Sequence, residues 1–217
     1  MSVEHQPRQV NGPRAYDSSR RREQSRQTHK ALLDVAQARF IEHGYTATTI
    51  ESIAADAEVS AATIYKSYGG KSGVVRALCE RALGGVGPVP AEQRSDALQT
   101  SEANPRKVIE GWGRLSTEVA PRIVPLLILL RDAAEGDPAA ASLYTELDAG
   151  RHARMRQNAR YLLDGGHSRP GISLSEATDV LWTYSSPELF DLLVRRRHWS
   201  LRRYSQFIVQ AITNALL

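Results

Sequence analysis

Residues 49–68 have the sequence TIESIAADAEVSAATIYKSY, and this stretch decides the fold class. Ile50, Ile53 and Ala54 recur at helical spacing, so the first part is expected to form a short helix with one apolar face. Ser60 is a suitable N-cap for a second short helix. Two short helices joined by a tight turn predict a helix-turn-helix.

The side chains of this stretch fit close packing of the two helices. Ala54 is small enough to let the second helix cross the first, and Val59 and Ile64 fill the wedge between them. The second helix then exposes a face that suits a major groove about 12 Å wide. That face consists of Ala61, Ala62, Thr63, Tyr65 and Lys66.

Helices are expected on both sides of this motif. Between residues 20 and 43 apolar side chains recur every three to four positions, and Gly44 stands where a helix commonly ends. Another helix is predicted over residues 71–83. The sequence GGVGPVP at 84–90 has the composition of a linker. We therefore expect a DNA-binding domain at 20–83 and a linker at 84–104.

Residues 105–217 also have helical patterns, and no segment alternates as a half-buried strand does. Pro125 is expected to kink or split an apolar helix over 121–135. The sequence therefore predicts an all-α chain with a second helical domain at 105–217. The further helices are expected over 138–165, 173–197 and 200–217.

The charge of the chain is concentrated at its beginning. The 217 residues carry a net charge of +4, and residues 1–30 alone hold seven Lys/Arg and three Asp/Glu. Residues 1–19 are poor in apolar side chains, which predicts a disordered basic arm. A basic arm before a folded domain favours an anionic partner, with nucleic acid first. Arg21 and Arg22, in the basic stretch Arg20–Arg26 that follows the arm, are the candidate contact residues, although a solvated tail is the alternative.

Several function classes lack their sequence signatures. A single cysteine excludes a disulfide framework and any multi-cysteine metal site. The six histidines form no two-histidine metal spacing, and no nucleophile elbow or phosphate-binding glycine loop is present. We expect no catalytic site, metal or cofactor. No apolar run is long enough for a membrane span, so we expect a cytoplasmic protein without a membrane partner.

The chain resembles the TetR family of transcriptional regulators over residues 25–83. The matching motifs are Phe40–Tyr45, Thr48–Ile50, Ile53–Ala54 and Val59–Tyr68, followed by Lys71. The resemblance implies a ligand-responsive DNA-binding regulator, a repressor that binds a palindromic operator as a homodimer. A small-molecule effector would release it from double-stranded DNA. The remainder, from residue 105 onward, is similar to the family's effector-binding and dimerisation half.

The resemblance also implies DNA contacts for individual residues. Thr49 would contact a phosphate, and Tyr65 and Lys71 would hold backbone phosphates, which suits their donor groups. The residues implied to face base edges are Ala61, Ala62, Thr63 and Lys66. Two alternatives stay open: Tyr65 and Tyr68 as core aromatics, and Lys66 and Lys71 as ordinary surface lysines.

Two positions depart from the family pattern. Glu58 stands where the family usually has glycine, so a left-handed backbone there would be strained by on the order of 1 kcal/mol. Its charge would also lie near the DNA-facing end. Gly69 and Gly70 replace a pair that is often more rigid.

Candidate effector-binding residues come from the second domain. Trp112 lies between two glycines in a helical context, where each glycine costs close to 1 kcal/mol relative to alanine. Arg131 interrupts an apolar helix and is expected to pair with an acidic ligand or with a neighbouring carboxylate. A mostly apolar cavity is the usual ligand site, although each of these side chains could belong to the core. The candidate set is Trp112, Leu127, Arg131, Tyr144, Met155 and Trp182.

The helices at 173–197 and 200–217 are the candidate homodimer surface. The last helix is apolar over a wide face, and two such helices from each copy would form a two-fold interface. Intramolecular core packing accounts for part of that face. Two alternative functions are open. The first is a helical small-molecule-binding protein that has lost specific DNA reading, and the second is a cofactorless enzyme, which no motif supports.

Overall fold

A computed structural model describes the chain over residues 18–217, leaving aside the side chains of residues 18, 19 and 21, and this part is helical without any strand. The predicted all-α class is confirmed. Nearly all of the predicted basic arm at 1–19 lies outside the described residues. The elements are α1 (Ser18–Ala47), α2 (Ile50–Asp56), α3 (Ala61–Tyr68), α4 (Lys71–Gly84), α5 (Ala91–Ser101), α6 (Pro105–Ala133), α7 (Pro138–Asp164), α8 (Leu174–Tyr184), α9 (Pro187–Phe190), the π-helix η1 (Asp191–Arg196) and α10 (Leu201–Leu216).

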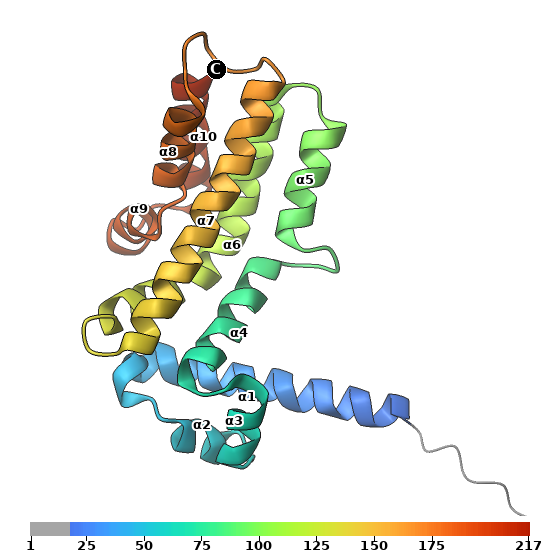
Figure 1. The fold of residues 1–217 in the computed structure, drawn as a ribbon, viewed down its shortest axis with the longest axis vertical. Helices are drawn as coiled ribbons and strands as arrows, with labels where there is room; N and C mark the ends of the chain where they lie inside the picture. Colours follow the sequence, from blue (N-terminus) through green and yellow to red (C-terminus); the bar gives the residue numbers. More distant parts are fainter. Residues whose placement is uncertain (1–17) are drawn as a thin grey trace, which may run out of the picture.

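The molecule is elongated, with α1–α3 at one end and the C-terminus at the other (Figure 1). Helix α4 leads from the first group of helices into a bundle of α6, α7, α8 and α10, and α5 lies against α6. The helix-turn-helix is therefore carried at one end of a long helical body.

Gly44 interrupts α1 as the sequence predicts. Its backbone has φ 79° and ψ 174°, which is outside the helical region. Tyr45 is then turned inward and stacks on Phe40 with ring centroids 6.0 Å apart. The buried Thr48 hydroxyl donates to the Gly44 carbonyl over 2.8 Å. This break directs the chain toward the start of α2.

The hydrophobic core does not stop at the expected domain boundary. One cluster joins the interior of the helix-turn-helix end, including Phe40 and Ile64, to Leu126 and Leu130 of α6. A second cluster around Trp112 fills the far half of the bundle. The two halves of the chain are therefore packed together rather than joined only by a linker.

Three element predictions differ from the structure. Residues 91–101, within the expected linker, form α5, whose Ala91 and Ser95 are buried. Helix α6 runs unbroken through Pro121 and Pro125, since its packing against α1, α4, α7 and α10 offsets the lost backbone hydrogen bonds. The predicted helix at 173–197 ends at Tyr184, because proline disfavours helical backbone at Ser186 before it.

Candidate nucleic-acid interface

The helix-turn-helix is held together by capping and by a small apolar interior. Thr49 accepts a hydrogen bond from the Ser52 amide over 3.0 Å, and the Ser52 side chain caps in return. The Ser60 hydroxyl caps α3 by accepting from the Thr63 amide over 3.1 Å. Ile53 and Ile64 are fully buried between the helices. Local sequence signals thus fix both helix starts and their packing.

One face of α3 is open to solvent. Ala62, Thr63, Tyr65 and Lys66 are exposed, whereas Ala61 is half-buried. Tyr65 has 51% of its surface exposed, which excludes the alternative that it is a core aromatic side chain. Figure 1 shows α2 and α3 side by side at the end of the molecule opposite the C-terminus. The predicted base-facing residues therefore lie on an accessible surface, with Ala61 at its edge.

Tyr68 and Lys71 have intramolecular contacts instead. Tyr68 is half-buried and meets His29 edge to face, with ring centroids 5.9 Å apart. The Lys71 ammonium donates to the Tyr45 carbonyl over 3.0 Å and lies 4.2 Å from the centre of the Tyr45 ring. Lys71 therefore ties α4 to the end of α1, a role that the sequence did not indicate.

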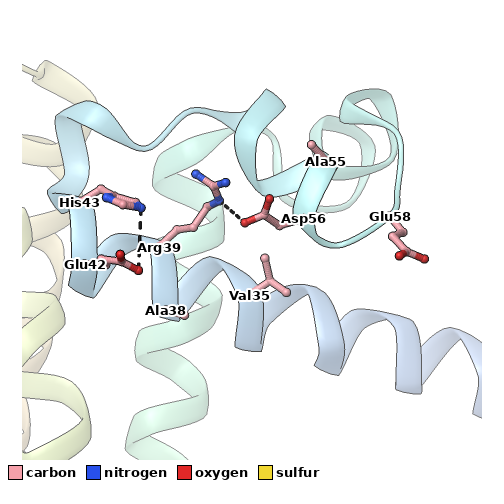
Figure 2. A pocket seen from close by; sticks show the side chains of 8 residues that line it. All are labelled: Val35, Ala38, Arg39, Glu42, His43, Ala55, Asp56 and Glu58. Carbon is pink, nitrogen blue, oxygen red and sulfur yellow. Dashed lines mark hydrogen bonds and ion pairs between the residues drawn. The ribbon is translucent and has the colours of Figure 1, made fainter.

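The turn between α2 and α3 contains a non-glycine residue with a left-handed backbone. Glu58 adopts φ 53°, in the left-handed region that favours glycine. Its side chain is exposed at the end of an open groove between α1 and α2 (Figure 2). The acidic group next to α3 is therefore a feature of the folded chain.

An ion pair crosses the same groove. Arg39 of α1 donates from Nε to an Asp56 oxygen over 2.6 Å, joining α1 to the last residue of α2 (Figure 2). This hydrogen bond lowers the pKa of Asp56 and raises that of Arg39. The two residues are 17 positions apart, so no local pattern could have paired them.

The N-terminal part of α1 extends beyond the rest of the helix-turn-helix (Figure 1). Arg22 is exposed there. The Arg21 side chain lies outside the described part, so its predicted DNA contact stays a prediction.

Trp112, the first effector candidate, is buried in the second core cluster. A Cβ on Gly111 would lie 2.5 Å from a Leu98 methyl, and a Cβ on Gly113 would lie 2.4 Å from a Val209 methyl. The two glycines therefore let α5 and α10 pack closely on α6. The buried indole Nε1 of Trp112 has no hydrogen-bond partner among the described residues.

Arg131 and Tyr144 meet at one carboxylate. Arg131 donates to Asp132 over 2.8 Å and to Glu188 over 3.4 Å, and the Tyr144 hydroxyl lies 3.5 Å from the same Glu188 oxygen. Arg131 thus has neighbouring carboxylates as partners, which is the alternative weighed from the sequence. Leu127 is buried in the first core cluster beside Tyr144.

The other two effector candidates lie further along the bundle. Trp182 is half-buried, and the Arg151 guanidinium lies 4.9 Å from its ring while donating to its carbonyl over 2.6 Å. The Trp182 indole nitrogen is a second buried donor without a partner in the described chain. Met155 packs against the second core cluster. Leu127 and Tyr144 therefore belong with the first core cluster and Trp112 and Met155 with the second, so the six candidates do not form one group.

The outer surface of the last helices combines apolar and polar groups. Leu201 and Phe207 of α10 each have 39% of their surface exposed. On α8 the exposed side chains include Glu176, Asp179 and Thr183. Among residues 18–217 no group of His, Cys, Asp or Glu is arranged to hold a metal ion, and no helix there could cross a membrane.

The all-helical body with an N-terminal helix-turn-helix defines a class of regulatory protein. Residues 32–78 match the family model described as "Bacterial regulatory proteins, tetR family". Two solved proteins described as putative TetR-family transcriptional regulators have a similar fold over most of their length. The helix-turn-helix end of this chain is therefore similar to the TetR family.

Three similar proteins illustrate the extent of the likeness. The regulator YvkB of Bacillus subtilis is 37% identical over 71 residues, which are 33% of this chain and 38% of that protein. The chain thus spans well under half the length of this relative. The SmeT–triclosan complex has a TM-score of 0.68 at 23% identity, covering 88% of this chain and 92% of SmeT. NalD of Pseudomonas aeruginosa, a repressor of a multidrug efflux pump, has a TM-score of 0.67 at 17% identity, covering 89% and 98%.

Proposed function

We propose that this protein is a ligand-responsive transcriptional regulator that binds a palindromic operator in double-stranded DNA as a homodimer and represses transcription. The exposed face of α3 carries this proposal, because Thr63, Tyr65 and Lys66 are open to solvent while Ile64 anchors the helix. Thr63 and Lys66 face base edges, and Tyr65 donates to a backbone phosphate. Thr49 and Arg22 contact neighbouring phosphates, as does Arg21.

The homodimer forms through α8 and α10. Phe207 supplies apolar contact area on α10, beyond residues 191–203, and a two-fold axis brings the same surface of a second copy against it. Two recognition helices about 34–36 Å apart then enter successive major grooves. Dimer formation therefore explains why the operator is expected to be palindromic.

The effector is a small, mostly apolar compound that carries a hydrogen-bond acceptor. Trp112 and Trp182 each bury an indole N–H without a partner in the described chain, and such a group costs free energy until an acceptor reaches it. Trp112 belongs to the second core cluster, against which Met155 packs. SmeT, of the same fold, is known in complex with triclosan. The effector binds the state with lower operator affinity and so releases the DNA.

The experiment that tests DNA reading is selection of bound sequences from a random duplex pool at moderate salt. A recovered palindrome supports both DNA reading and two-fold symmetry, and it supplies the probe for effector screening. Absence of enrichment with a folded, dimeric sample would favour the alternative, a ligand-binding protein that no longer reads DNA. Glu58 is the residue to replace first in that case.

Lys66 and Lys71 are expected to differ in their contribution to operator binding. Lys66 is exposed on α3, whereas the Lys71 ammonium already donates to the Tyr45 carbonyl. Lys66→Ala should lower the affinity and, if the ammonium also neutralises a phosphate, reduce the slope of log K against log salt by about 1. Lys71→Ala should leave that slope nearly unchanged and lower the melting temperature instead. A larger slope change for Lys71 would restore it as a phosphate contact.

A further inference from the structure

A second concentration of positive charge lies far from the helix-turn-helix in the sequence. Residues 191–203, DLLVRRRHWSLRR, contain five arginines, one histidine and one aspartate. Five positive charges less one negative charge give +4 for this segment, equal to the net charge of the whole chain. Residues 1–30 carry a further +4, so all remaining residues together sum to −4. We call residues 191–203 the arginine segment.

The arginine segment is a defined structure. Asp191 is buried, and its two oxygens accept from Arg195 over 3.0 Å and from Arg196 over 2.7 Å. The Arg197 amide donates to the Leu192 carbonyl over 3.1 Å, closing the π-helical turn. These contacts hold the backbone and two guanidinium groups in place, so an incoming anion meets a preformed surface.

The same segment continues into α10 and carries cations in its first turn. Arg203 lies 3.9 Å from the centre of the Trp199 ring. Arg202 is exposed, and no acidic residue stands in the first turn of α10. Cations are unfavourable at this end of a helix, because the helix dipole is positive there. The arrangement is therefore costly to the isolated protein, and an anionic partner would relieve it.

Two of the five guanidinium groups are free to bind such a partner. Arg197 and Arg202 are exposed and have no ion pair among the described residues. By contrast, the arginines of α7 are partly neutralised, since Arg154 is paired with Glu92 and Asp96. The arginine segment thus differs from the other basic stretch of this domain.

We infer that the arginine segment is a sequence-independent binding surface for the phosphate backbone of a second DNA duplex, distinct from the duplex held by α3. All five cations are arginines, whose planar guanidinium groups match phosphate oxygens in two-point contacts. The segment lies beside the helical bundle, away from α2 and α3 (Figure 1). One duplex in the groove-binding position therefore leaves this surface open.

A nucleic acid fits this surface better than a lipid membrane does. A membrane-bound helix inserts a wide apolar face, but the apolar side chains of α10, such as Tyr204 and Ile208, are buried in the core. The large apolar side chains of η1 and α10 that stay exposed are Leu192, Leu201 and Phe207, which are too few to form such a face. Phosphate contacts need only the cations.

The test is a two-duplex capture experiment with the full chain. An immobilised operator duplex from the selection binds the protein, and retention of a labelled, unrelated duplex is then measured over a range of salt concentrations. Wild-type protein should retain the labelled duplex. The double variant Arg197→Gln/Arg202→Gln should lose most of this retention, with a salt slope smaller by about 2, because two phosphate contacts are removed. Its binding to the operator duplex should be unchanged.

A matched control removes the same charge elsewhere. Arg156 and Arg160 are exposed on α7, so Arg156→Gln/Arg160→Gln should retain the second duplex as wild type does. Equal loss in both double variants, or no retention by wild-type protein bound to operator, would overturn the inference. Binding to phosphatidylserine vesicles that depends on Arg197 and Arg202, without duplex retention, would identify a membrane as the partner and would also overturn it.

The inference is separable from the proposed function. If no operator is found, the unrelated duplex is instead titrated into free protein and followed by fluorescence anisotropy. Loss of binding in Arg197→Gln/Arg202→Gln but not in Lys66→Ala would then support the arginine segment while DNA reading by α3 fails. Loss of duplex binding in Lys66→Ala alone would support DNA binding by α3 and contradict the role of the arginine segment.

Discussion

Glu58 is the residue at which sequence and backbone conflict most directly. It has φ 53°, a conformation that glycine adopts at no steric cost, and it precedes the cap of α3 by two positions. The Glu58 amide still donates to the Ala55 carbonyl over 3.3 Å, and Val59 closes the turn on Ala54 over 3.0 Å. The turn is therefore formed by its neighbours in spite of the residue at its centre.

Glu58→Gly should stabilise the protein by about 1 kcal/mol, because the left-handed strain is removed. It should also tighten operator binding, because a carboxylate near the phosphates is lost. Glu58→Gln separates the two effects, since it removes the charge and keeps the side chain. Urea unfolding and operator titration of both variants check this. Equal stability of wild type and Glu58→Gly would contradict the strain argument.

The stability of the fold at acidic pH is expected to depend on the Glu118 carboxyl group. Hydrogen bonds from Arg94, and then from the Val86 amide, lower the pKa of Glu118 from 4.5 to about 2. A carboxyl with a depressed pKa stabilises the fold above its unfolded pKa and loses that contribution as the pH falls through the folded value. Stability should thus decline between about pH 4.5 and 2. Glu118→Gln should flatten this decline in urea unfolding, whereas Glu110→Gln, an exposed site on the same helix, should not.

At the scale of elements, α6 determines how tightly the bundle can close. Gly113 allows α10 to approach so closely that a Cβ would lie 2.4 Å from the Val209 methyl and 3.0 Å from the Ser205 hydroxyl. Gly150 of α7, in contrast, has nothing within 4 Å of its Cβ position. Two helical glycines therefore have opposite structural roles.

Gly113→Ala should destabilise the protein by roughly 1–3 kcal/mol, because an added methyl overpacks the contact between α6 and α10. Gly150→Ala is the matched control and should stabilise by up to about 1 kcal/mol through helix propensity. Thermal unfolding of the two variants measures both effects. A stabilising Gly113→Ala would mean that α10 can move away without loss.

At the scale of the whole molecule, the helix-turn-helix end and the bundle share a core and an ion pair. Arg76 of α4 forms a two-point contact with Glu146 of α7, with one of the two distances 2.7 Å. Leu78 of α4 belongs to the same buried cluster as Leu130 of α6. Movement of α4 is therefore coupled to the bundle that would hold the effector.

Glu146→Arg should loosen α4 from α7, because it places two cations together. Amide exchange in α4 should become faster by up to roughly five-fold, which corresponds to the loss of one surface ion pair. The double variant Arg76→Glu/Glu146→Arg should restore the wild-type exchange. Hydrogen-exchange mass spectrometry measures this, and failure of the double variant to recover would show that the charges are not the cause.

Much of the helix-turn-helix was predictable because its signals are local. Ser60 caps α3, Gly44 breaks α1, and the spacing of Ile53 and Ile64 buries them between two helices. The surroundings of the candidate effector-binding residues were not predictable to the same degree. Arg131 and Glu188 are 57 residues apart, and Trp112 belongs to a core cluster that also includes residues of α7, α8 and α10. Helix periodicity and helix capping contain no information on contacts between residues that are distant in the sequence.

The sequence by itself determined the helical class, the two helices of the helix-turn-helix and which face of α3 is polar, because helix periodicity and capping act over three or four residues. Only the tertiary structure decided that the Lys71 ammonium donates to the Tyr45 carbonyl and that Arg39 forms an ion pair with Asp56. It also decided that α6 continues through two prolines. These outcomes depend on which surfaces meet when distant segments pack, and burial at such contacts outweighs the local preference of a single residue.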